Sequence, residues 1–456
     1  MTLGCFKSYD VRGRVGEDLD EAICRRIGRA FAAVMTPGTV VLGRDIRATS
    51  EAFQQALAEG LLESGVDVID LGLCGTEEVY FATDHYGAGG GLMVTASHNP
   101  IDYNGIKFVE RGAKPIPPDG GFLQIRDLVA EGIDPPGGPR GTLRQEDHRP
   151  AYVERVLSFV DPKAITGLKV LVNAGNGCAG PTFDAIAEAL AARGAEIAFE
   201  RLHHAPDGSF PNGIPNPLLP ENRPGTSEAV TASGADFGIA WDGDFDRCFL
   251  FDETGAFIDG EYLVGLLAEA FLEKVPGATI VHDPRVMWNT QEVVARMGGE
   301  AVASLTGHAH VKAAMRRVDA VYGGEMSAHH YFRDFMYCDS GMIPWLLIAE
   351  HLSKTGTPLS ELIGEMRAAY PSSGEINFRV SDADAAIAAI EAALVDDTCE
   401  IDRMDGLSLA FADWRLNLRR SSTEPVLRLN VEARGDRALL ERKKEAVLAL
   451  IRPFEA

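Results

Sequence analysis

Residues Thr39–Gly72 read TVVLGRDIRATSEAFQQALAEGLLESGVDVIDLG, and this order of apolar and polar residues decides the fold class. A β-branched apolar run is followed by a polar loop, a run with helical periodicity, a glycine and a second apolar run. This order predicts a strand, a helix and a second, parallel strand. It recurs, with different residues, over Leu168–Leu202 and Ala278–Gly307. The sequence therefore predicts an α/β fold with three similar domains whose sheets are mixed and largely parallel.

The end of the chain follows a different order. After Tyr370, a helical run is followed by strand-like runs around a polar loop and by a closing helical run, which predicts a C-terminal α+β domain. Stretches rich in proline, glycine and polar residues at 131–147 and 368–375 are the predicted linkers. A length of 456 residues suits about three or four domains of roughly 150 residues or fewer. The predicted domains are 1–148, 149–253, 254–369 and 370–456.

Composition excludes several classes of function. The formal net charge of −24 argues against a nucleic-acid binder, which needs a basic face. The seven cysteines are scattered and form no C-x-x-C pair, so neither structural zinc nor a disulfide framework is expected. The first residues lack the apolar core of a signal peptide, and no apolar run reaches about 18 residues. We expect a cytoplasmic protein with no membrane, nucleic-acid or obligate protein partner.

The stretch GGGLMVTASHNPIDYNGIKF, residues 89–108, delivers one serine to the end of an apolar strand. Ser97 has three interpretations from these residues alone: a turn residue, a hydrolase nucleophile or a carrier of phosphate. The glycines of the G-x-S-x-G nucleophile turn are absent, which argues against the hydrolase. The choice between the other two depends on the remaining motifs.

A second stretch, GIAWDGDFDRCFLFDETG at 238–255, places three carboxylates at alternate positions in Asp242, Asp244 and Asp246. Carboxylates this close repel one another unless a cation neutralises them, and hard oxygen ligands suit Mg²⁺ or Ca²⁺. An EF-hand would need glycine where Arg247 stands, so that alternative fails. An acidic, solvated turn remains the simpler alternative. A phosphate on Ser97 would complete the shell of a bound Mg²⁺.

Two further stretches offer groups for a sugar and an anion. In GGEMSAHHYFRDF, residues 323–335, Glu325, Ser327 and His329 alternate and therefore share one face of an extended segment. The carboxylate and hydroxyl suit sugar hydroxyls, and His329 is a candidate proton-transfer group, although a packing role is the commoner one for a lone histidine. In LRRSSTEPVLRLNV, residues 418–431, a guanidinium and three hydroxyls form either an anion cradle or a polar hairpin loop. Its residues are Arg419, Ser421, Ser422 and Thr423.

With these stretches the chain resembles the α-D-phosphohexomutase family, and within it the bacterial phosphomannomutase/phosphoglucomutase branch, over essentially its whole length. TASHNP and YNGIKF resemble the phosphoserine loop, DGDFDR the Mg²⁺ loop, GEMS the sugar loop and RRSSTEP the phosphate loop. The phosphate loop departs from the common pattern, because Ser422 stands where asparagine is usual. In the sugar loop, Ala328 stands where a glycine often precedes the histidine.

The resemblance implies a role for each matched residue. It implies catalytic roles for Ser97, Lys107, His329, Arg12 and Arg247, metal ligation by Ser97, Asp242, Asp244 and Asp246, and substrate binding by Tyr9, Arg285, His308, Glu325, Ser327, Arg419, Ser421, Ser422 and Thr423.

The implied activity is the interconversion of mannose 6-phosphate and mannose 1-phosphate, and also of the glucose phosphates. It would proceed through a phosphoserine and a hexose 1,6-bisphosphate, with Mg²⁺ as cofactor and four domains around a central cleft. Hexose phosphates are the expected small-molecule partners. A phosphoglucosamine mutase and a phosphoserine-dependent sugar-phosphate phosphatase are the alternatives. The phosphatase would need no anion cradle distant from Ser97, so the loop around Arg419 argues against it.

Overall fold

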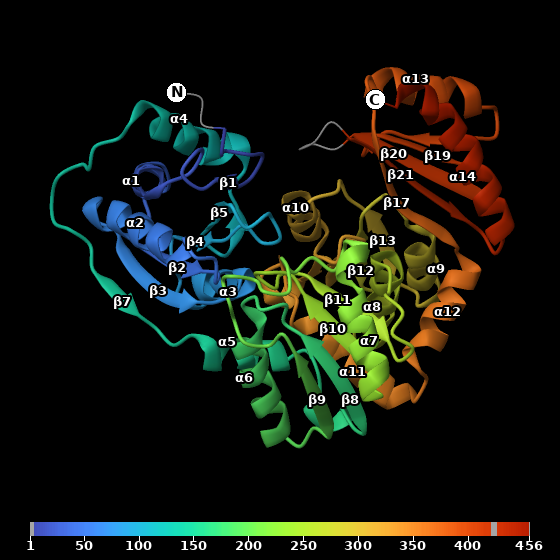
Figure 1. Ribbon diagram of the computed structural model, residues 1–456, viewed down its shortest axis with the longest axis horizontal. Helices are drawn as coiled ribbons and strands as arrows, with labels where there is room; N and C mark the ends of the chain where they lie inside the picture. Colours follow the sequence, from blue (N-terminus) through green and yellow to red (C-terminus); the bar gives the residue numbers. More distant parts are fainter. Residues whose placement is uncertain (1–3, 421–425, 456) are drawn as a thin grey trace. The chain divides into compact units, whose positions relative to one another are not determined.

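The computed structural model describes residues 4–420 and 426–455 (Figure 1). The chain divides into two compact units. The first unit comprises Met1–Phe257 and His329–Gly356, and the second comprises Ile258–Ala328 and Thr357–Ala456. Within the described residues, no helix is both long and apolar enough to cross a bilayer.

The first unit begins with a mixed sheet whose strands follow the order β1–β5–β4–β2–β3–β7, with β6 beside β5. Strands β4, β2, β3 and β7 are parallel, whereas β5 is antiparallel to its neighbours β4, β1 and β6. The elements are β1 (Val11–Arg14), α1 (Glu21–Met35), β2 (Thr39–Arg44), α2 (Ser50–Glu63), β3 (Asp67–Leu73), α3 (Thr76–His85), β4 (Gly90–Val94), β5 (Tyr103–Glu110), β6 (Lys114–Pro115), α4 (Leu123–Glu131) and β7 (Leu143–Gln145).

Helix α1 packs on one face of this sheet, and its sequence explains where the helix begins, where it ends and which face is buried. The carboxylate of Asp20 accepts the backbone N–H of Ile23 at 2.7 Å and so caps the first turn. Ile23, Ile27 and Phe31 recur at intervals of four residues and are buried on one face. Thr36 ends the helix in the left-handed conformation. The buried face of α1 therefore follows directly from the spacing of its apolar residues.

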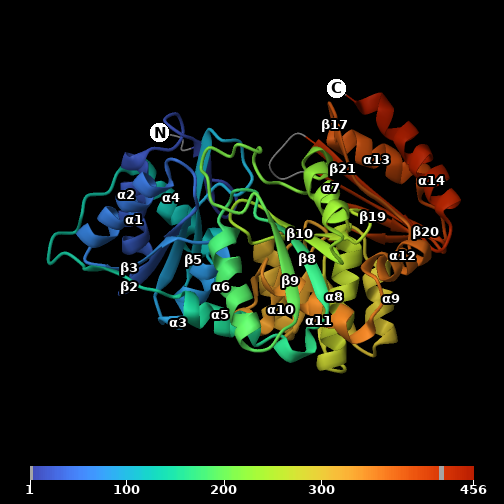
Figure 2. The same ribbon diagram turned by 60° about the horizontal axis from the view of Figure 1, so that its bottom comes forward.

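The parallel strands of this sheet are buried on both faces. Val40 and Leu42 of β2 join the apolar core that also contains residues of α1, α2 and α4. Val41, between them, joins a second core with Val79 and Ala82 of α3. Figures 1 and 2 show α1 and α2 on one side of the sheet and α3 on the other. A run of consecutive apolar residues is what a strand covered by helices on both faces requires.

The first unit continues with a second sheet of order β11–β10–β8–β9. Strands β9, β8 and β10 are parallel and β11 is antiparallel to β10. Figure 2 shows α6 and α7 on opposite sides of this sheet. The elements are α5 (Arg149–Leu157), β8 (Leu168–Asn173), α6 (Ala179–Ala192), β9 (Ile197–Leu202), α7 (Pro224–Ser233), β10 (Phe237–Trp241) and β11 (Cys248–Asp252), with β15 (His330–Phe332), β16 (Cys338–Asp339) and α11 (Ile343–Thr355).

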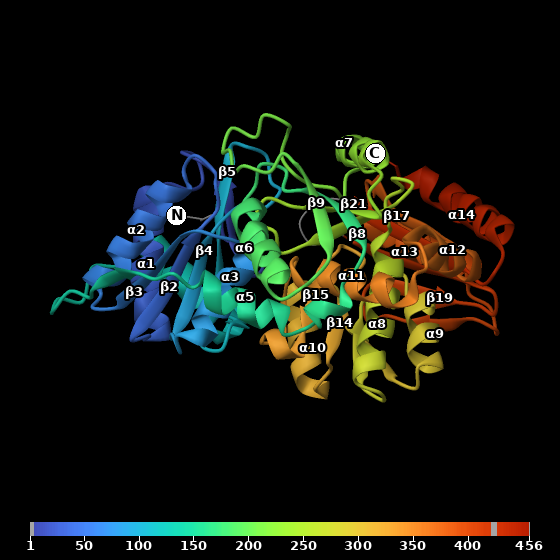
Figure 3. The same ribbon diagram turned by 90° about the horizontal axis from the view of Figure 1, so that it is seen from below.

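The second unit contains a parallel group, β13–β12–β14, and a five-stranded antiparallel sheet, β17–β21–β20–β19–β18. Helix α10 lies on one side of the parallel group and α8 and α9 lie on the other (Figures 1 and 3). Helices α13 and α14 share the apolar core of the antiparallel sheet. The elements are α8 (Gly260–Lys274), β12 (Thr279–His282), α9 (Trp288–Arg296), β13 (Glu300–Ala303), α10 (His308–Val318), β14 (Tyr322–Gly324), α12 (Leu359–Ala369), β17 (Ser372–Arg379), α13 (Ala383–Leu394), β18 (Glu400–Asp402), β19 (Leu407–Ala410), β20 (Trp414–Arg420), β21 (Val426–Ala433) and α14 (Arg437–Ile451).

The three parallel groups share one strand order, which confirms the predicted fold class of similar α/β domains followed by an α+β domain. The order is β3–β2–β4 in the first group, β9–β8–β10 in the second and β13–β12–β14 in the third. In each group the loop after the last strand carries one of the predicted motifs. In open α/β sheets the carboxyl ends of the strands are where ligands bind. The fold therefore places the three motifs at equivalent positions.

Both predicted linkers contribute to sheets. Within 131–147, β7 pairs in parallel with β3, with Leu143 opposite Val68. Within 368–375, Ser372 already begins β17. Both are edge strands without fully buried side chains, so they lack the continuous apolar run that indicates a buried strand in a sequence. The four domain ranges remain a prediction.

The crossing of α1 and α2 makes Gly60 a sensitive position. A Cβ on Gly60 would lie 2.1 Å from the carbonyl oxygen of Arg25, so Gly60→Ala must push two packed helices apart. We expect this change to lower the free energy of unfolding of the first unit by roughly 1–3 kcal/mol. Gly364→Ala is the control, because Gly364 is exposed on α12 and nothing lies within 4 Å of its Cβ position. Gly364→Ala should raise the free energy of unfolding by roughly 0.5–1 kcal/mol, which is the difference in helix propensity between alanine and glycine.

Calorimetry measures the change in unfolding free energy for each variant. Hydrogen exchange of peptides from α2 and α12 shows whether each change in stability arises at the substituted helix. Similar shifts for both variants would contradict close packing at the crossing of α1 and α2.

Candidate functional site

Ser97 lies in the loop between β4 and β5, in a backbone conformation that is uncommon for serine. Its φ of +47° is in the left-handed region. Non-glycine residues in this region cost free energy and persist only where their surroundings impose them. Here the backbone N–H of Ser97 donates to the Oγ1 of Thr95 at 2.8 Å. The loop therefore holds Ser97 in one orientation.

The side chain of Arg47 fixes the rest of this loop. Its guanidinium donates to the carbonyl oxygens of Ser97 at 3.1 Å and Asn99 at 2.6 Å. It also donates to those of Pro100 at 2.8 Å and Tyr103 at 2.9 Å. The residue is buried, at 4% exposure. Arg47 was not predicted from the sequence, although it is a charged residue in the polar loop that follows the apolar strand β2.

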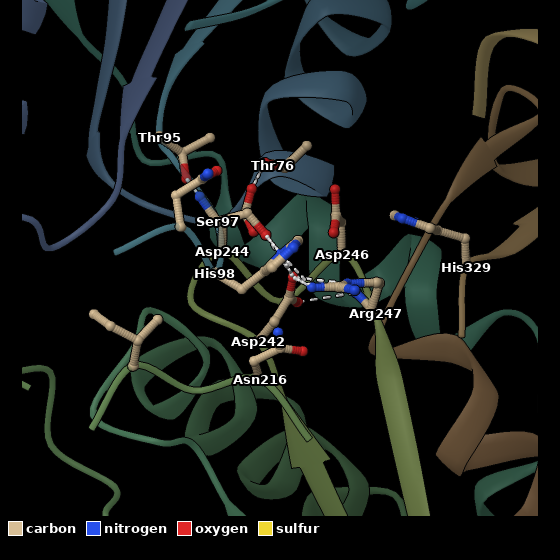
Figure 4. A network of polar contacts seen from close by, with 12 residues as sticks. Thr76, Thr95, Ser97, His98, Asn216, Asp242, Asp244, Asp246, Arg247 and His329 are labelled. Carbon is tan, nitrogen blue, oxygen red and sulfur yellow. Dashed lines mark hydrogen bonds and ion pairs between the residues drawn. The ribbon is translucent and has the colours of Figure 1, made fainter. Parts of the chain in front are cut away.

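The acidic loop between β10 and β11 meets the serine loop within the first unit (Figure 4). Asp242, Asp244 and Asp246 are buried, and the Oγ of Ser97 donates to the Oδ2 of Asp242 at 2.6 Å. The two loops also touch through their backbones, because a Cβ on Gly243 would lie 2.6 Å from the carbonyl oxygen of Ser97. Glycine at this position therefore permits the close approach.

Lys107, on β5, lies between two of these carboxylates. Its ammonium donates to Asp244 at 2.7 Å and to Asp246 at 2.5 Å. Burial alone would lower the pKa of Lys107, but the two carboxylates raise it above its ordinary value. Burial would raise the pKa of Asp244, yet Lys107 holds it below its ordinary value. Burial, and then the charge of Asp244, raise the pKa of Asp246 to about 6. One ammonium therefore does not neutralise all three carboxylates.

The three carboxylates have the composition and spacing of a site for a divalent cation. One oxygen from each lies within 4.8 Å of the others. Among the described residues, the Oδ1 atoms of Asp244 and Asp246 are buried without a hydrogen-bond partner. Buried carboxylate oxygens seldom lack a partner, and hard oxygen ligands suit Mg²⁺. The residues present therefore fit the predicted metal.

Two arginines surround this acidic group. Arg247 contacts the Oδ2 of Asp242 through its Nε at 2.9 Å and its Nη2 at 2.8 Å, and it also approaches the ring of His98. Arg12, on β1, donates to the carbonyl oxygen of Thr95 at 3.0 Å. The first unit thus collects Arg12, Lys107 and Arg247 around Ser97, although the whole chain is strongly acidic. Tyr9, just before β1, is half-buried.

His329 belongs to the first unit and is paired with a carboxylate. Its Nδ1 lies 2.9 Å from the Oδ2 of Asp339, the last residue of β16. Ligand atoms of His329, Asp339 and Asp246 lie within 4.8 Å of one another. By contrast, His330 is fully buried, and burial lowers its pKa to about 3. Asp339 was not predicted from the sequence, because ten positions separate it from His329.

A buried carboxyl group holds the segment that carries Asp339. Glu77 at the start of α3 accepts hydrogen bonds from the Oγ of Ser340, at 2.8 Å, and from the backbone of Gly341 and the hydroxyl of Tyr152. Burial raises the pKa of Glu77 well above its ordinary value. This group joins α3, α5 and the segment after β16, and it sets the position of β16 within the first unit.

The second unit brings the predicted sugar residues together. Glu325 accepts the backbone N–H of Gly307 at 2.8 Å, next to His308 at the start of α10. The guanidinium of Arg285 lies 3.8 Å from Glu325 and 3.4 Å from the Oγ of Ser327. Helix α10 and the loops after β12 and β14 therefore supply one group of side chains.

Asp283 holds this group in place. Its Oδ2 accepts the Nη2 of Arg285 at 2.7 Å and the backbone N–H of Met326 at 2.8 Å. The loop that carries Arg285 is thereby joined to the loop that carries Glu325 and Ser327.

Arg419, at the end of β20, lies in the same unit. It donates to Glu375 at 3.0 Å, and Arg428 on β21 donates to the other oxygen of that carboxylate at 3.2 Å. Glu375 was missed by sequence analysis, because it stands in a predicted linker. Three of the predicted phosphate-binding residues lie outside the described residues, namely Ser421, Ser422 and Thr423.

Family models match nearly the whole chain. Those for the phosphoglucomutase/phosphomannomutase α/β/α domains I, II and III match residues 4–132, 150–255 and 259–370, and the C-terminal domain matches 375–450.

Curated relatives and a solved structure agree with these matches. A phosphomannomutase of Salmonella montevideo is 58% identical over 451 residues, which cover 98% of this chain and 99% of that protein. A protein of Xanthomonas campestris pv. campestris named phosphohexose mutases is 56% identical over 452 residues, covering 99% of this chain and all of that one. The crystal structure of a phosphoglucomutase/phosphomannomutase family protein from Burkholderia thailandensis superposes with a TM-score of 0.87 at 33% identity, covering 98% and 97% of the two chains.

The geometry of the acidic loop predicts one strong divalent-cation site. Isothermal titration with Mg²⁺ and with Mn²⁺ should give one site per chain. Asp244→Asn removes a charged ligand and should weaken binding by at least about tenfold, because affinity follows the charge of the ligands. Glu188→Gln, on the exposed face of α6, removes the same charge without touching the loop and should leave binding unchanged. Equal affinities for the wild type and Asp244→Asn would rule out this metal site.

Proposed function

The chain belongs to the phosphoglucomutase/phosphomannomutase family and is therefore an isomerase, and we propose that it interconverts mannose 6-phosphate and mannose 1-phosphate. We extend the proposal to glucose 6-phosphate and glucose 1-phosphate. The reaction uses a phosphoserine at Ser97 and passes through a hexose 1,6-bisphosphate. Relatives named phosphomannomutase, at more than half identity over nearly the full length, support the substrate class.

One observation carries the proposed chemistry. The Oγ of Ser97 lies 2.6 Å from the Oδ2 of Asp242, where a loop from the first sheet meets the acidic loop of the second. A hydroxyl held against a group of metal-binding carboxylates, and flanked by Arg12, Lys107 and Arg247, is placed to carry a phosphate. The three carboxylates would hold Mg²⁺, which when bound would neutralise charge on the phosphate.

The chain's residues take the following parts in the transfer. The phosphoryl group leaves the Oγ of Ser97 and bonds to a hydroxyl oxygen of the hexose monophosphate, and that hydroxyl loses its proton. The Oγ of Ser97 then takes up a proton. Phosphoryl transfer depends chiefly on positioning and charge neutralisation. The negative charge on the equatorial oxygens of the transferred phosphoryl group is stabilised by Lys107, Arg247 and Arg12. In the second half of the reaction the other phosphate returns to Ser97, and the isomer is released.

His329 is the proposed proton acceptor. A proton on its Nδ1, donated to Asp339, places the lone pair on Nε2 and fixes the orientation of the ring. A base oriented in this way by a carboxylate is a common arrangement in proton transfer.

The second unit supplies the proposed substrate-binding groups. Glu325 and Ser327 bind the 3- and 4-hydroxyls, which mannose and glucose share. Their 2-hydroxyls differ, and we assign no residue to that position, so both sugars are expected substrates. Arg285 and His308 lie beside Glu325 and contribute to the same group, whereas Arg419 binds the phosphate that is not reacting. We retain Ser421, Ser422 and Thr423 as partners of Arg419 and Tyr9 as a substrate contact.

A coupled assay tests the proposal. The enzyme should convert mannose 1-phosphate and glucose 1-phosphate at rates that differ by less than a factor of about 10⁴. Greater discrimination would need a residue that hydrogen-bonds specifically to the 2-hydroxyl. Ser97→Ala should lose nearly all turnover and keep sugar-phosphate binding. Ser158→Ala, an exposed serine on the same unit, is the control and should keep full activity.

Two outcomes would favour the alternatives. Faster turnover of glucosamine 6-phosphate than of either hexose phosphate would make the enzyme a phosphoglucosamine mutase. Stoichiometric release of inorganic phosphate would make it a phosphatase.

A further inference from the structure

Glu375 lies among three arginines that come from three different segments of the second unit. Its carboxylate is 3.0 Å from Arg419 on β20, 3.2 Å from Arg428 on β21 and 3.4 Å from Arg285 after β12. The strand β17 that carries Glu375 has an irregular register with β21 between Ser372 and Glu375. Such irregularities re-aim a side chain and are frequent next to active sites.

The carboxylate of Glu375 is charged in this setting. Burial would raise its pKa, but the guanidinium groups of Arg285, Arg428 and Arg419 hold the pKa below its ordinary value. Arg419 is itself 8% exposed. The single carboxylate of Glu375 therefore contacts three guanidinium groups. Arg419 contacts one of its oxygens and Arg428 contacts the other.

The guanidinium of Arg419 is only partly engaged by this contact. Its Nη2 donates to Glu375, while its Nε is buried and has no hydrogen-bond partner among the described residues. An arginine fork binds phosphate through two parallel donors, and a single carboxylate contact leaves one of them unused. The geometry therefore suits an anion that replaces or supplements Glu375.

We propose that Glu375 is a built-in competitor of the ligand phosphate: its carboxylate holds Arg419 while no ligand is bound and weakens the binding of the phosphate that displaces it. This inference rests on the proposed function, in which Arg419 binds the non-reacting phosphate. The carboxylate keeps the guanidinium in position before the ligand arrives, which lowers the cost of ordering it. Its negative charge then opposes the phosphate and speeds release.

A competing role would be purely structural, with Glu375 serving only to hold β17, β20 and the loop after β12 together. The two roles predict opposite effects of a Glu375 substitution on phosphate affinity. Neutralising a competitor strengthens phosphate binding, whereas removing a structural ion pair loosens Arg419 and weakens it. Glu375→Gln keeps the shape and the hydrogen-bonding capacity of the side chain and removes only its charge, so it separates the two roles.

The test measures glucose 6-phosphate binding by calorimetry in a Ser97→Ala background, where turnover is absent. We expect Glu375→Gln to strengthen binding by about tenfold, as one nearby charge does at a partly screened site. The gain should vanish when Arg419→Ala is added, because the competition acts through that guanidinium. Glu391→Gln is the matched control, since Glu391 forms an ion pair with Arg403 on the surface of the same C-terminal region, and it should change nothing.

In the active enzyme, Glu375→Gln should lower both KM and kcat, because a ligand that is bound more tightly leaves more slowly. Weaker binding by Glu375→Gln, or a gain that persists with Arg419→Ala, would overturn the proposal. Should Glu375→Gln fail to fold, Glu375→Asp withdraws the carboxylate by one methylene and should give a smaller gain; a loss would equally overturn it. An inactive wild type in the coupled assay would instead count against the proposed function.

Discussion

The first unit is organised around the need to bury three carboxylates side by side. Two unit charges 4 Å apart interact by roughly 4 kcal/mol at an effective dielectric constant of 20, so Asp242, Asp244 and Asp246 cannot share a buried loop without cations. Lys107 from β5 supplies one positive charge and Arg247 another, and within residues 4–420 and 426–455 two of the carboxylate oxygens have no hydrogen-bond partner. Lys107 from the adjoining sheet and Arg247 of the loop itself oppose part of this negative charge, and the part left unopposed is what a bound divalent cation would neutralise.

The serine loop is adapted to the same requirement. Ser97 adopts a left-handed backbone conformation, and Arg47 holds four carbonyl oxygens of its loop. Gly243 lets the backbones of the two loops touch. Each of these features limits how far Ser97 can move from Asp242. Phosphoryl transfer depends on such positioning, because misplacement of about an ångström can cost orders of magnitude in rate. The second unit meets a comparable requirement with opposite charges, since there the guanidinium groups are in excess around Glu375.

Much of the fold could be predicted, because its signals are local. The apolar run, helical run and second apolar run of Thr39–Gly72 correspond to β2, α2 and β3. The motifs around Ser97, Asp244 and Glu325 could also be located, since each interrupts a regular pattern with several functional groups. The sequence could not reveal which distant residues support them. Arg47 acts on carbonyl oxygens some fifty positions away, and Glu375 meets Arg419 across 44 positions. Such partners depend on tertiary geometry, which spacing along the chain does not encode.

The central claim is that Ser97 carries the phosphoryl group, and following that group tests it most directly. Peptide mapping of the active enzyme by mass spectrometry should find phosphate on Ser97. Rapid quenching after addition of excess glucose 6-phosphate should show that phosphate leaving the peptide as an equal amount of hexose bisphosphate appears, before the steady state is reached. A preparation that turns over at its full rate with no phosphate on Ser97, before or during the reaction, would contradict the account.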